Sequence, residues 1–599
     1  MTTNYLFLLT ALLGLQVSLA GAGKQNQPVY VRFNQAGYLP DDQKELILFS
    51  NQPITATFEL VNTETGQGVF RAKPIPSHAD GWMDFRYFYT LDFSAVKGIG
   101  KYLLRSPYVL NNGQDIYLNI GAYPAFQEDL LGFMRQQRCG YNPFLDRTCH
   151  QQDGRVFYSP LPDSAYVDVS GGWHDAGDQL KYLITSSNAT ARMLLAFELE
   201  QNKFSDLSNE LGQPYANGIP DVLDEAKWGL DWLLKMHPQN GHLYHQVADD
   251  RDHMGWKWPD SDPSDYGWGA NSYRVAYFAD GNPQGLGRYK SQATGIANLA
   301  GRSAAALAMG ARIMEGFLPT GSIAIYREAA EDLYRMGRQK EGFQQGNSFG
   351  APYRYNEITW QDDMEWAATE LYRLTGETHY LTEAQLYAEA IGAEGLLIKD
   401  SAAHYEQYPF INVGHFALYP HVSKAFQEKL ASYYRQGIEK SLLRARQNVF
   451  GAGVPFIWCS NNVTVGLITQ IMLYEQMTGD RQYHSLMIAN RDWLLGRNPW
   501  GTSMFMHIPA HAEYPRDVHT STWALTHQEV PGGLVDGPIW RSIYDQLIGL
   551  ELNRSDEFRD FQNDYIVYHD DIGDYSTNEP TMDGTADAIL MMAAFSSEK

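Results

Sequence analysis

Two acids separated by two small residues are the first candidates for chemistry. Asp175 and Asp178 flank Ala-Gly in the segment DVSGGWHDAGDQLKY, residues 168–182. Small residues between two acids let the backbone turn tightly and bring both carboxylates towards one point. Such a carboxylate could deprotonate a water molecule that attacks a sugar carbon, while a separate acid protonates the leaving oxygen from the other side. A helix N-terminal acid pair or a calcium loop would explain the same residues equally well.

A candidate for the separate acid lies near the C-terminus. Glu579 falls in YHDDIGDYSTNEPTMDGTADAI, residues 568–589, between Asn578 and Pro580 and just before a helical run. A glutamate in this place could equally cap the helix that follows it. Taken alone, the segment therefore does not identify an enzyme.

Two cysteines and two histidines form a second candidate site. Cys139 and Cys149 bound the segment CGYNPFLDRTC, His150 follows the second cysteine, and His174 directly precedes Asp175. Two thiolates and two imidazoles make a closed tetrahedral set for a structural zinc ion. A metal here would clamp the loop that enters the helical region to the segment with Asp175. A Cys139–Cys149 disulfide is the alternative, because the chain carries an export signal, described below.

The residue patterns around these sites divide the chain into two parts. From residue 29 to about residue 120, short runs rich in Val, Ile, Tyr and Phe alternate with Gly, Pro and Asn clusters, as in 29–33, 56–61 and 101–105. This pattern predicts a small antiparallel β-sandwich. Beyond residue 123, apolar residues recur at i, i+3, i+4 and i+7, for example in 222–236, 295–313 and 364–376, which predicts helices.

The predicted helices favour a barrel of helical hairpins. Several are apolar around much of their circumference, as expected for the inner ring of a double-layered barrel. The segments 371–381 and 473–484 both end a helix at Thr-Gly and restart one after an acidic residue. The glycine supplies a left-handed C-cap. A solenoid is disfavoured because the long, irregular segments between the helices would not stack evenly.

Charge and the N-terminal segment limit the partners and the location. The chain carries 70 acidic and 46 basic residues, a net charge of −24, which excludes nucleic acid and anionic lipid as natural partners. Residues 5–20 are apolar but short for a membrane span, and Ala20-Gly21-Ala22 follows as at a cleavage site, so we expect a signal peptide over 1–22 and export to the periplasm or beyond the cell. No Lys or Arg precedes the apolar run, which leaves a retained anchor as the alternative. No later stretch is apolar and long enough to span a bilayer, so stable membrane association is not expected.

These segments together resemble glycoside hydrolase family nine, the cellulase family with an inverting mechanism and an (α/α)6 barrel. The resemblance extends over nearly the whole chain, with matching segments in the same order and at the same spacing. They are VRFNQAGYLP (31–40), GIPDVLDEAKWGLDWLLKMH (218–237), LYHQVADDRDHMGW (243–256), WCSNN (458–462), LLGRNPWGTS (494–503) and PGGLVDGP (531–538). It implies an immunoglobulin-like sandwich over 28–120 and an (α/α)6 barrel over 123–599.

The resemblance also implies roles for the candidate residues. Asp178 would activate the water, Asp175 would help to hold it, and Glu579 would be the general acid. The acid must be protonated at working pH, so Glu579 should have apolar or acidic neighbours, for which Asp574 and Tyr575 are candidates. Members with this Cys…Cys-His and Trp-His-Asp-Ala-Gly-Asp combination bind zinc, which favours zinc over the disulfide. The zinc ligands would be Cys139, Cys149, His150 and His174.

The chain departs from the family where a His-His-Arg triplet usually binds the sugar beside the scissile bond. In EYPRDVHTSTW, residues 513–523, His519 matches the first histidine, whereas Thr520 and Ser521 replace the other two residues. Arg516 could substitute for the missing arginine from the same loop. Trp256 and Tyr575 are the aromatic residues that we expect to stack on sugar rings.

This departure leaves the substrate open. The main hypothesis is endo-acting hydrolysis of β-1,4 bonds in cellulose-like or related β-glucans, and the alternative is an exo-acting β-glucosaminidase or β-glucosidase. A non-catalytic glycan-binding protein is disfavoured because all three acids are present. Calcium is common in the family, but solvated loop charge explains the candidate acids better, so no calcium site is assigned. These acids are Asp249, Asp250, Asp252, Asp570 and Asp571. No organic cofactor is expected, and the sequence does not indicate the oligomeric state.

Overall fold

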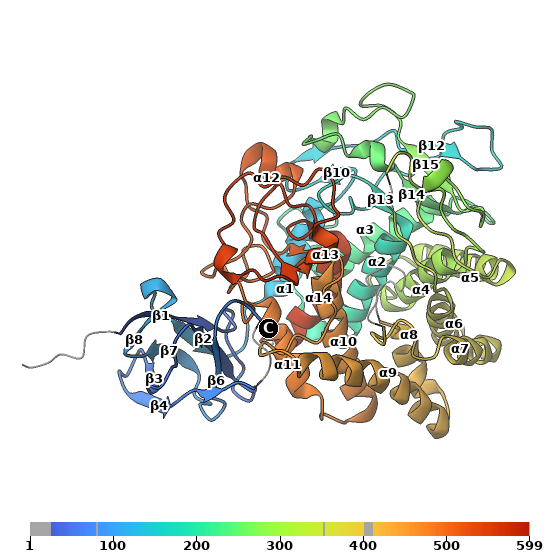
Figure 1. Ribbon diagram of the computed structural model, residues 1–599. Helices are drawn as coiled ribbons and strands as arrows, with labels where there is room; N and C mark the ends of the chain where they lie inside the picture. The colour runs from blue at the N-terminus through green and yellow to red at the C-terminus, as the bar shows by residue number, and fades with distance from the viewer. Residues whose placement is uncertain (1–24, 79–81, 352–353, 400–410, 598–599) are drawn as a thin grey trace, which may run out of the picture.

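The computed structural model describes residues 25–78, 82–351, 354–399 and 411–597 (Figure 1). The predicted signal peptide, residues 1–22, lies outside the described residues. An all-β part, blue in Figure 1, lies against one side of a larger helical part. The predicted order of a sandwich followed by a helical barrel is thus confirmed.

The β part contains two facing sheets, with strand orders β5-β6-β2-β1-β8 and β4-β3-β7-β9. Strand β2, ELILFS, is apolar without alternation because the larger sheet is covered on both faces. Leu46 and Leu48 join the core of the sandwich, whereas Ile47 and Phe49 join the core of the helical part. The strands are β1 (Gln25–Arg32), β2 (Glu45–Ser50), β3 (Phe58–Asn62), β4 (Gly68–Ala72), β5 (Ile75–Pro76), β6 (Tyr87–Asp92), β7 (Gly100–Arg105), β8 (Tyr108–Leu110) and β9 (Tyr117–Ile120).

The helical part is a closed barrel of two layers. In the inner ring each helix packs against the next, and the last packs against the first. The inner helices are α2 (Leu183–Leu199), α4 (Ala297–Ile313), α6 (Gln361–Thr375), α8 (Val413–Leu418), α10 (Ser460–Thr478) and α14 (Met582–Phe595). The outer helices alternate with them along the chain and are α1 (Phe126–Gln136), α3 (Asp221–Met236), α5 (Thr320–Gln339), α7 (Thr378–Ile391), α9 (Lys424–Ala445) and α11 (His484–Leu494). This is the predicted (α/α)6 arrangement.

Burial and capping explain why the sequence forms this ring. Every residue of α2 from Leu183 to Phe197 is buried, as an inner position requires, whereas α5 buries only one face. Gly376 and Gly479 end α6 and α10 in the left-handed conformation, so both predicted Thr-Gly helix ends are confirmed. Within the described ranges, no helix combines the length and apolarity needed to cross a bilayer.

Short strands and loops gather at one end of the barrel, the upper end in Figure 1. Here β12 (Arg155–Phe157), β13 (Lys181–Tyr182), β14 (Tyr244–Val247) and β15 (Val275–Phe278) form one sheet. The antiparallel pair β16 (Leu534–Val535) and β19 (Pro580–Thr581) leads into α14. The remaining short elements are β10 (Tyr141–Asn142), β11 (Arg147–Thr148), α12 (Ser521–Thr526), β17 (Ile539–Trp540), α13 (Arg541–Tyr544) and β18 (Ile566–Val567).

Candidate active site

The structure brings the turn with Asp175 and Asp178 together with the C-terminal segment that contains Glu579. The backbone N–H of Gly177 donates to Glu579 Oε1 at 2.9 Å, and the N–H of Met582 donates to the carbonyl of Asp175 at 2.9 Å. A Cβ on Gly177 would lie 2.2 Å from the carbonyl oxygen of His519 and 2.7 Å from Glu579 Oε1. Only glycine therefore permits this approach, which places the three predicted acids in one site.

Two hydroxyl groups hold Asp175. Thr185 on α2 donates to Oδ1 at 2.8 Å, and Tyr355 donates to Oδ2 at 2.7 Å. Burial raises the pKa of Asp175, and the charges of Asp583 and Asp178 raise it further. Because both oxygens of Asp175 have fixed donors, the carboxylate keeps one orientation.

Asp178 has a cationic partner. His253 Nε2 donates to Asp178 Oδ2 at 3.2 Å, and the N–H of Leu180 donates to Oδ1 at 3.0 Å. Burial alone would raise the pKa of Asp178, but the hydrogen bond and charge of His253 lower it below its usual value. The same contact raises the pKa of His253 against its own desolvation. Asp178 is thus kept ionised, as a base requires.

Glu579 has the opposite environment. Burial raises its pKa well above the usual value, and the charges of Asp178 and Asp536 add to the effect. The acidic neighbourhood predicted for Glu579 exists, but these two residues create it rather than Asp574. Asp574 instead accepts hydrogen bonds from His569, Ser576 and Thr577. Two carboxyl groups with opposed pKa shifts in one site are the usual arrangement of a base and an acid.

A row of aromatic side chains lies beside these carboxyl groups. The ring of His519 is 4.6 Å from that of Trp256 and 6.0 Å from that of Tyr575, and Trp458 continues the row 6.0 Å from Tyr575. His519 Nδ1 donates to the carbonyl of Ile572 at 2.6 Å. Burial lowers the pKa of His519, so the ring is neutral and its Nε2 is an acceptor. The row thus brings together three of the four residues predicted to bind sugar.

The structure shows what replaces the family's His-His-Arg triplet. The hydroxyl of Thr520 accepts the N–H of Trp523 at 3.2 Å and caps α12, which begins at Ser521. Ser521 Oγ accepts the N–H of Lys257 at 3.3 Å. The two residues therefore fix backbone segments and supply no charged fork.

Arg516 lies elsewhere in the same loop. Its guanidinium covers the ring of Tyr514, donates to the hydroxyl of that tyrosine at 2.8 Å and pairs with Glu529 at 3.3 Å. Among the described residues, the hydrogen bonds and ion pair of its guanidinium reach Tyr514 and Glu529 and no carboxylate of the site. Its role in sugar binding stays a prediction.

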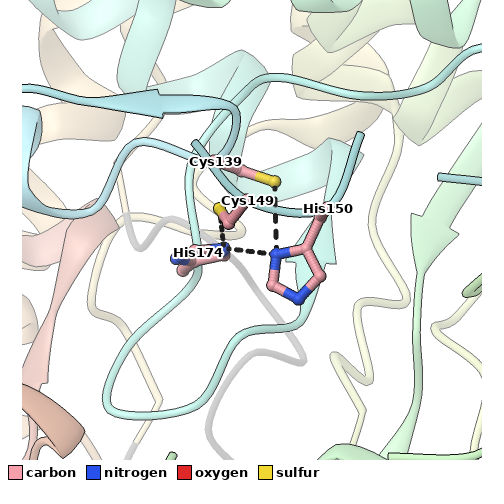
Figure 2. Close-up of side chains that lie close together, drawn as sticks. All are labelled: Cys139, Cys149, His150 and His174. Atoms are coloured by element: carbon pink, nitrogen blue, oxygen red, sulfur yellow. Dashed lines mark hydrogen bonds between the residues drawn. The ribbon is translucent and has the colours of Figure 1, made fainter. Parts of the chain in front are cut away.

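The four predicted metal ligands also meet (Figure 2). Their ligand atoms all lie within 4.8 Å of one another. Cys139 Sγ is 3.7 Å from His150 Nδ1, Cys149 Sγ is 3.9 Å from His174 Nε2, and the two nitrogens are 3.4 Å apart. Tetrahedral zinc with these ligands has edges of about 3.3 to 3.8 Å. Both thiols are free, so the alternative disulfide is not formed.

A network of buried charges connects this group to the turn with Asp175 and Asp178. His150 Nε2 donates to Asp262 at 3.3 Å, and Lys257 Nζ bridges Asp262 and Asp252 at 2.9 and 2.8 Å. Asp252 in turn accepts the N–H of Gln179, the residue after Asp178, at 2.7 Å. The four predicted metal ligands are thus connected to the turn with Asp175 and Asp178 through this network as well as through His174.

The acids considered for calcium have protein partners. Asp249 binds Arg251 and Tyr277, and Asp252 binds Lys257. Asp250, Asp570 and Asp571 accept backbone N–H groups. Asp249, Asp252, Asp570 and Asp571 are buried, so protein donors rather than solvent hold their charges, and the expected solvated loop charge is wrong for these four.

Comparison with protein families decides the identity. A family model described as glycosyl hydrolase family 9 matches residues 123–592, and one described as the cellulase N-terminal ig-like domain matches residues 26–109. The chain belongs to glycosyl hydrolase family 9. The predicted glycoside hydrolase with an immunoglobulin-like N-terminal domain is therefore confirmed.

Individual family 9 proteins agree with this assignment. Endoglucanase C of Cellulomonas fimi is 26% identical over 92% of this chain, which spans 50% of that protein. The xyloglucan-specific endo-β-1,4-glucanase of Bacteroides ovatus is 26% identical over 89% of this chain and 90% of its own length.

Solved structures show the same fold. A metagenome-derived family 9 endoglucanase superposes with a TM-score of 0.71 at 24% identity, covering 95% of this chain and 99% of its own. A Zn-binding triple mutant of the family 9 endoglucanase J30 superposes with a TM-score of 0.72 at 24% identity, covering 94% and 100%.

Proposed function

We propose that this family 9 protein hydrolyses β-1,4-glycosidic bonds within cellulose-like or related β-glucans, with inversion at the anomeric carbon. The observation that carries the proposal is the opposed environment of two carboxyl groups in one site. His253 keeps Asp178 ionised, whereas burial and neighbouring charge keep Glu579 protonated. The names of the endoglucanase relatives support the β-1,4-glucan substrate.

Each acid has a distinct role in this mechanism. Asp178 takes a proton from water as the water attacks the anomeric carbon, and Asp175 orients the same water from a carboxylate fixed by Thr185 and Tyr355. Glu579 gives its proton to the departing glycosidic oxygen. The side chains of Trp256, His519 and Tyr575 stack against or hydrogen-bond the sugars on either side of the bond.

Two variants and one spectrum test this mechanism. We expect Glu579→Gln to lower kcat on cello-oligosaccharides at least 1,000-fold. On a dinitrophenyl glycoside the loss of kcat should be about two orders of magnitude smaller, because that leaving group needs no proton. Asp178→Asn should be inactive on both substrates. Proton NMR of the first product should show the α-anomer. Retention of the β-anomer, or a Glu579→Gln enzyme as active as wild type on cello-oligosaccharides, would refute the mechanism.

An exo-acting β-glucosaminidase is the second candidate. The site groups five acids, Asp175, Asp178, Asp536, Asp583 and Glu579. Among the described residues, His253 and Lys257 are cations that act on Asp178, and Lys257 is itself paired with Asp252 and Asp262. Ser521 replaces the family's arginine. Such a field suits a sugar that carries an ammonium group. Product sizes from cellotetraose, lichenan and chitosan oligomers separate the candidates. Internal cuts in the glucans support the endoglucanase, and release of single glucosamine units supports the alternative.

We also propose that Cys139, Cys149, His150 and His174 hold a structural zinc ion. Burial alone would raise the pKa of Cys139, but hydrogen bonds from Cys149 and the histidines and the charge of Lys181 lower it, which suits a thiolate ligand. Plasma mass spectrometry should find about one zinc per chain, and Cys149→Ser should lose the metal and lower the unfolding midpoint. Intact-mass analysis that shows a Cys139–Cys149 bridge would contradict the assignment.

Export is the remaining part of the proposal. The apolar segment 5–20 and the small residues after it support cleavage near Ala22. N-terminal sequencing of protein from the periplasm or medium should begin near residue 23. An uncleaved chain in the membrane fraction would instead support a retained anchor.

A further inference from the structure

Asp536 lies beside the general acid on the neighbouring strand. In the pair β16·β19, Val535 is opposite Pro580, and the N–H of Asp536 donates to the carbonyl of Glu579 at 2.9 Å. Directly opposed residues of an antiparallel pair place their side chains on the same face. Asp536 is only 1% exposed, and its charge raises the pKa of Glu579.

Two side chains donate hydrogen bonds to the carboxyl group of Asp536. Cys459 precedes α10 in the left-handed conformation, with φ 55° and ψ 41°, and its thiol donates to Asp536 Oδ1 at 3.1 Å. The side chain of Trp458 also hydrogen-bonds Asp536. An indole N–H can only donate, and the positive N-terminal end of α10 favours an anion at this place. Burial raises the pKa of Asp536, and the hydrogen bonds of Cys459 and Trp458 act against that rise, so they favour its carboxylate form.

We propose that Asp536 is a positioning residue whose carboxylate, fixed by Cys459 and Trp458, keeps the proton of the Asp536–Glu579 pair on Glu579. The inference rests on the proposed role of Glu579 as the general acid. Two adjacent buried carboxyl groups do not both ionise, so the pair shares a proton. Glu579 Oε1 already accepts the N–H of Gly177, which leaves Oε2 to carry that proton to the leaving oxygen.

The other charged groups around the pair act in the same direction. Asp178 and Asp175 face Glu579, and Asp583 and Asp574 act on Asp536. Burial and these acids raise the pKa of both groups, and hydrogen bonds act against the rise. Glu579 has one such donor, Gly177, whereas Asp536 has two, Cys459 and Trp458. The cations His253 and Lys257 act on Asp178. The donors on Asp536 thus decide which of the two acids is ionised.

The pH profile of kcat/KM tests the proposal with three variants. Asp536→Asn keeps the shape of the side chain but removes its charge. The alkaline limb of kcat/KM on cello-oligosaccharides, which reports loss of the Glu579 proton, should therefore move to a pH about one unit lower, and kcat/KM above the limb should fall about tenfold. Cys459→Ala removes one donor and should move the limb in the same direction, whereas Cys459→Ser keeps a donor and should retain the wild-type limb. A dinitrophenyl glycoside needs no acid, so the alkaline limb that Glu579 causes should be absent for that substrate in the wild type and in every variant.

The outcomes separate this inference from the proposed function. If Glu579→Gln is inactive on cello-oligosaccharides but Asp536→Asn keeps the wild-type limb, Glu579 is the acid and Asp536 does not position its proton. If Glu579→Gln is fully active, the proposed function itself fails. Circular dichroism reports folding of each variant. Should Asp536→Asn fail to fold, equal limbs in Cys459→Ala and Cys459→Ser would overturn the inference.

Discussion

One hydroxyl group from a distant loop orients Asp175. Tyr355 donates to Asp175 Oδ2 at 2.7 Å in a buried setting. A hydrogen bond to a charged group contributes about 1.5 to 3 kcal/mol. We therefore expect Tyr355→Phe to lower kcat roughly 10- to 100-fold, with KM within threefold of wild type. Steady-state kinetics on cellotetraose checks this.

Tyr434→Phe is the matched control, because it removes another buried tyrosine hydroxyl, one that donates to the carbonyl of Asn412. It should leave kcat unchanged. If both variants lose kcat equally, general loss of packing rather than orientation of Asp175 is the cause.

At this scale the sequence reveals the acids but not their partners. The motifs around Asp175, Asp178 and Glu579 identify these residues as candidate catalytic acids. Tyr355 lies 180 residues beyond Asp175 in a loop without periodicity, so only the folded chain shows their contact. His253 lies inside the segment DRDHMGW, and its acidic neighbours are a signal that could have marked it as a partner for a carboxylate.

Among the elements, the six-residue helix α12 directly follows His519, for which we propose sugar binding. Thr520 caps it through the N–H of Trp523, and His519 precedes the cap. Loss of an N-cap costs about 1 kcal/mol. Thr520→Val removes the hydroxyl but keeps the shape, so we expect KM for cello-oligosaccharides to rise about three- to tenfold with little change in kcat.

Thr520→Ser retains the capping oxygen and should behave as wild type in the same assay. A wild-type KM in Thr520→Val would show that α12 does not hold His519 in place.

Long inner helices and their ends are predictable from the sequence, whereas short elements are not. Composition marks α4 and α10, because both helices are apolar on most sides. The end of α10 is marked as well, because the helix stops at Thr-Gly. The inner helix α8 has only six residues, too few for a helical period to be read. The sheet β12-β15-β14-β13 joins strands of two to four residues from distant segments, and no local pattern specifies that pairing.

In the molecule as a whole, buried ion pairs join the sandwich to the barrel. Asp42 Oδ2 accepts from Arg491 Nη2 at 2.8 Å, and the arginine side chain is fully buried. Arg491 also pairs with Asp492 at 2.7 Å, so removal of Asp42 leaves the guanidinium one carboxylate and should cost about 1.5 to 3 kcal/mol, as for a hydrogen bond to a charged group. Asp42→Ala should therefore lower the urea midpoint of both parts together, as followed by tryptophan fluorescence.

Asp41→Ala offers a neighbouring control, because Asp41 pairs with Lys97 on the surface. It should leave the midpoint unchanged, since exposed pairs contribute little. Equal midpoints for Asp42→Ala and Asp41→Ala would show that this contact does not couple the two parts.

A buried carboxyl group in the barrel, that of Glu357, should lower the free energy of unfolding as pH rises. Glu357, Asp362 and Asp363 surround the single guanidinium of Arg302, and burial followed by the charges of Asp363 and Asp362 raises the pKa of Glu357 well above its usual value. Below about pH 4.3, the unfolded value, the group is protonated in both states and has no effect. Above it the unfolded chain ionises while the folded protein keeps the proton, so unfolding becomes more favourable until the pH passes the folded pKa.

Glu357→Gln removes this dependence while keeping a donor and an acceptor beside Asn298, which now donates to Glu357 Oε2 at 2.8 Å. Each unit of the raised pKa corresponds to about 1.4 kcal/mol. The variant should therefore be at least that much more stable than wild type at pH 8, with equal stability near pH 4, in urea unfolding at both values. Glu331→Gln, which changes a surface pair on α5, should keep the wild-type slope. Parallel pH curves for Glu357→Gln and wild type would show that Glu357 is ionised inside the barrel, with Arg302 compensating all three acids.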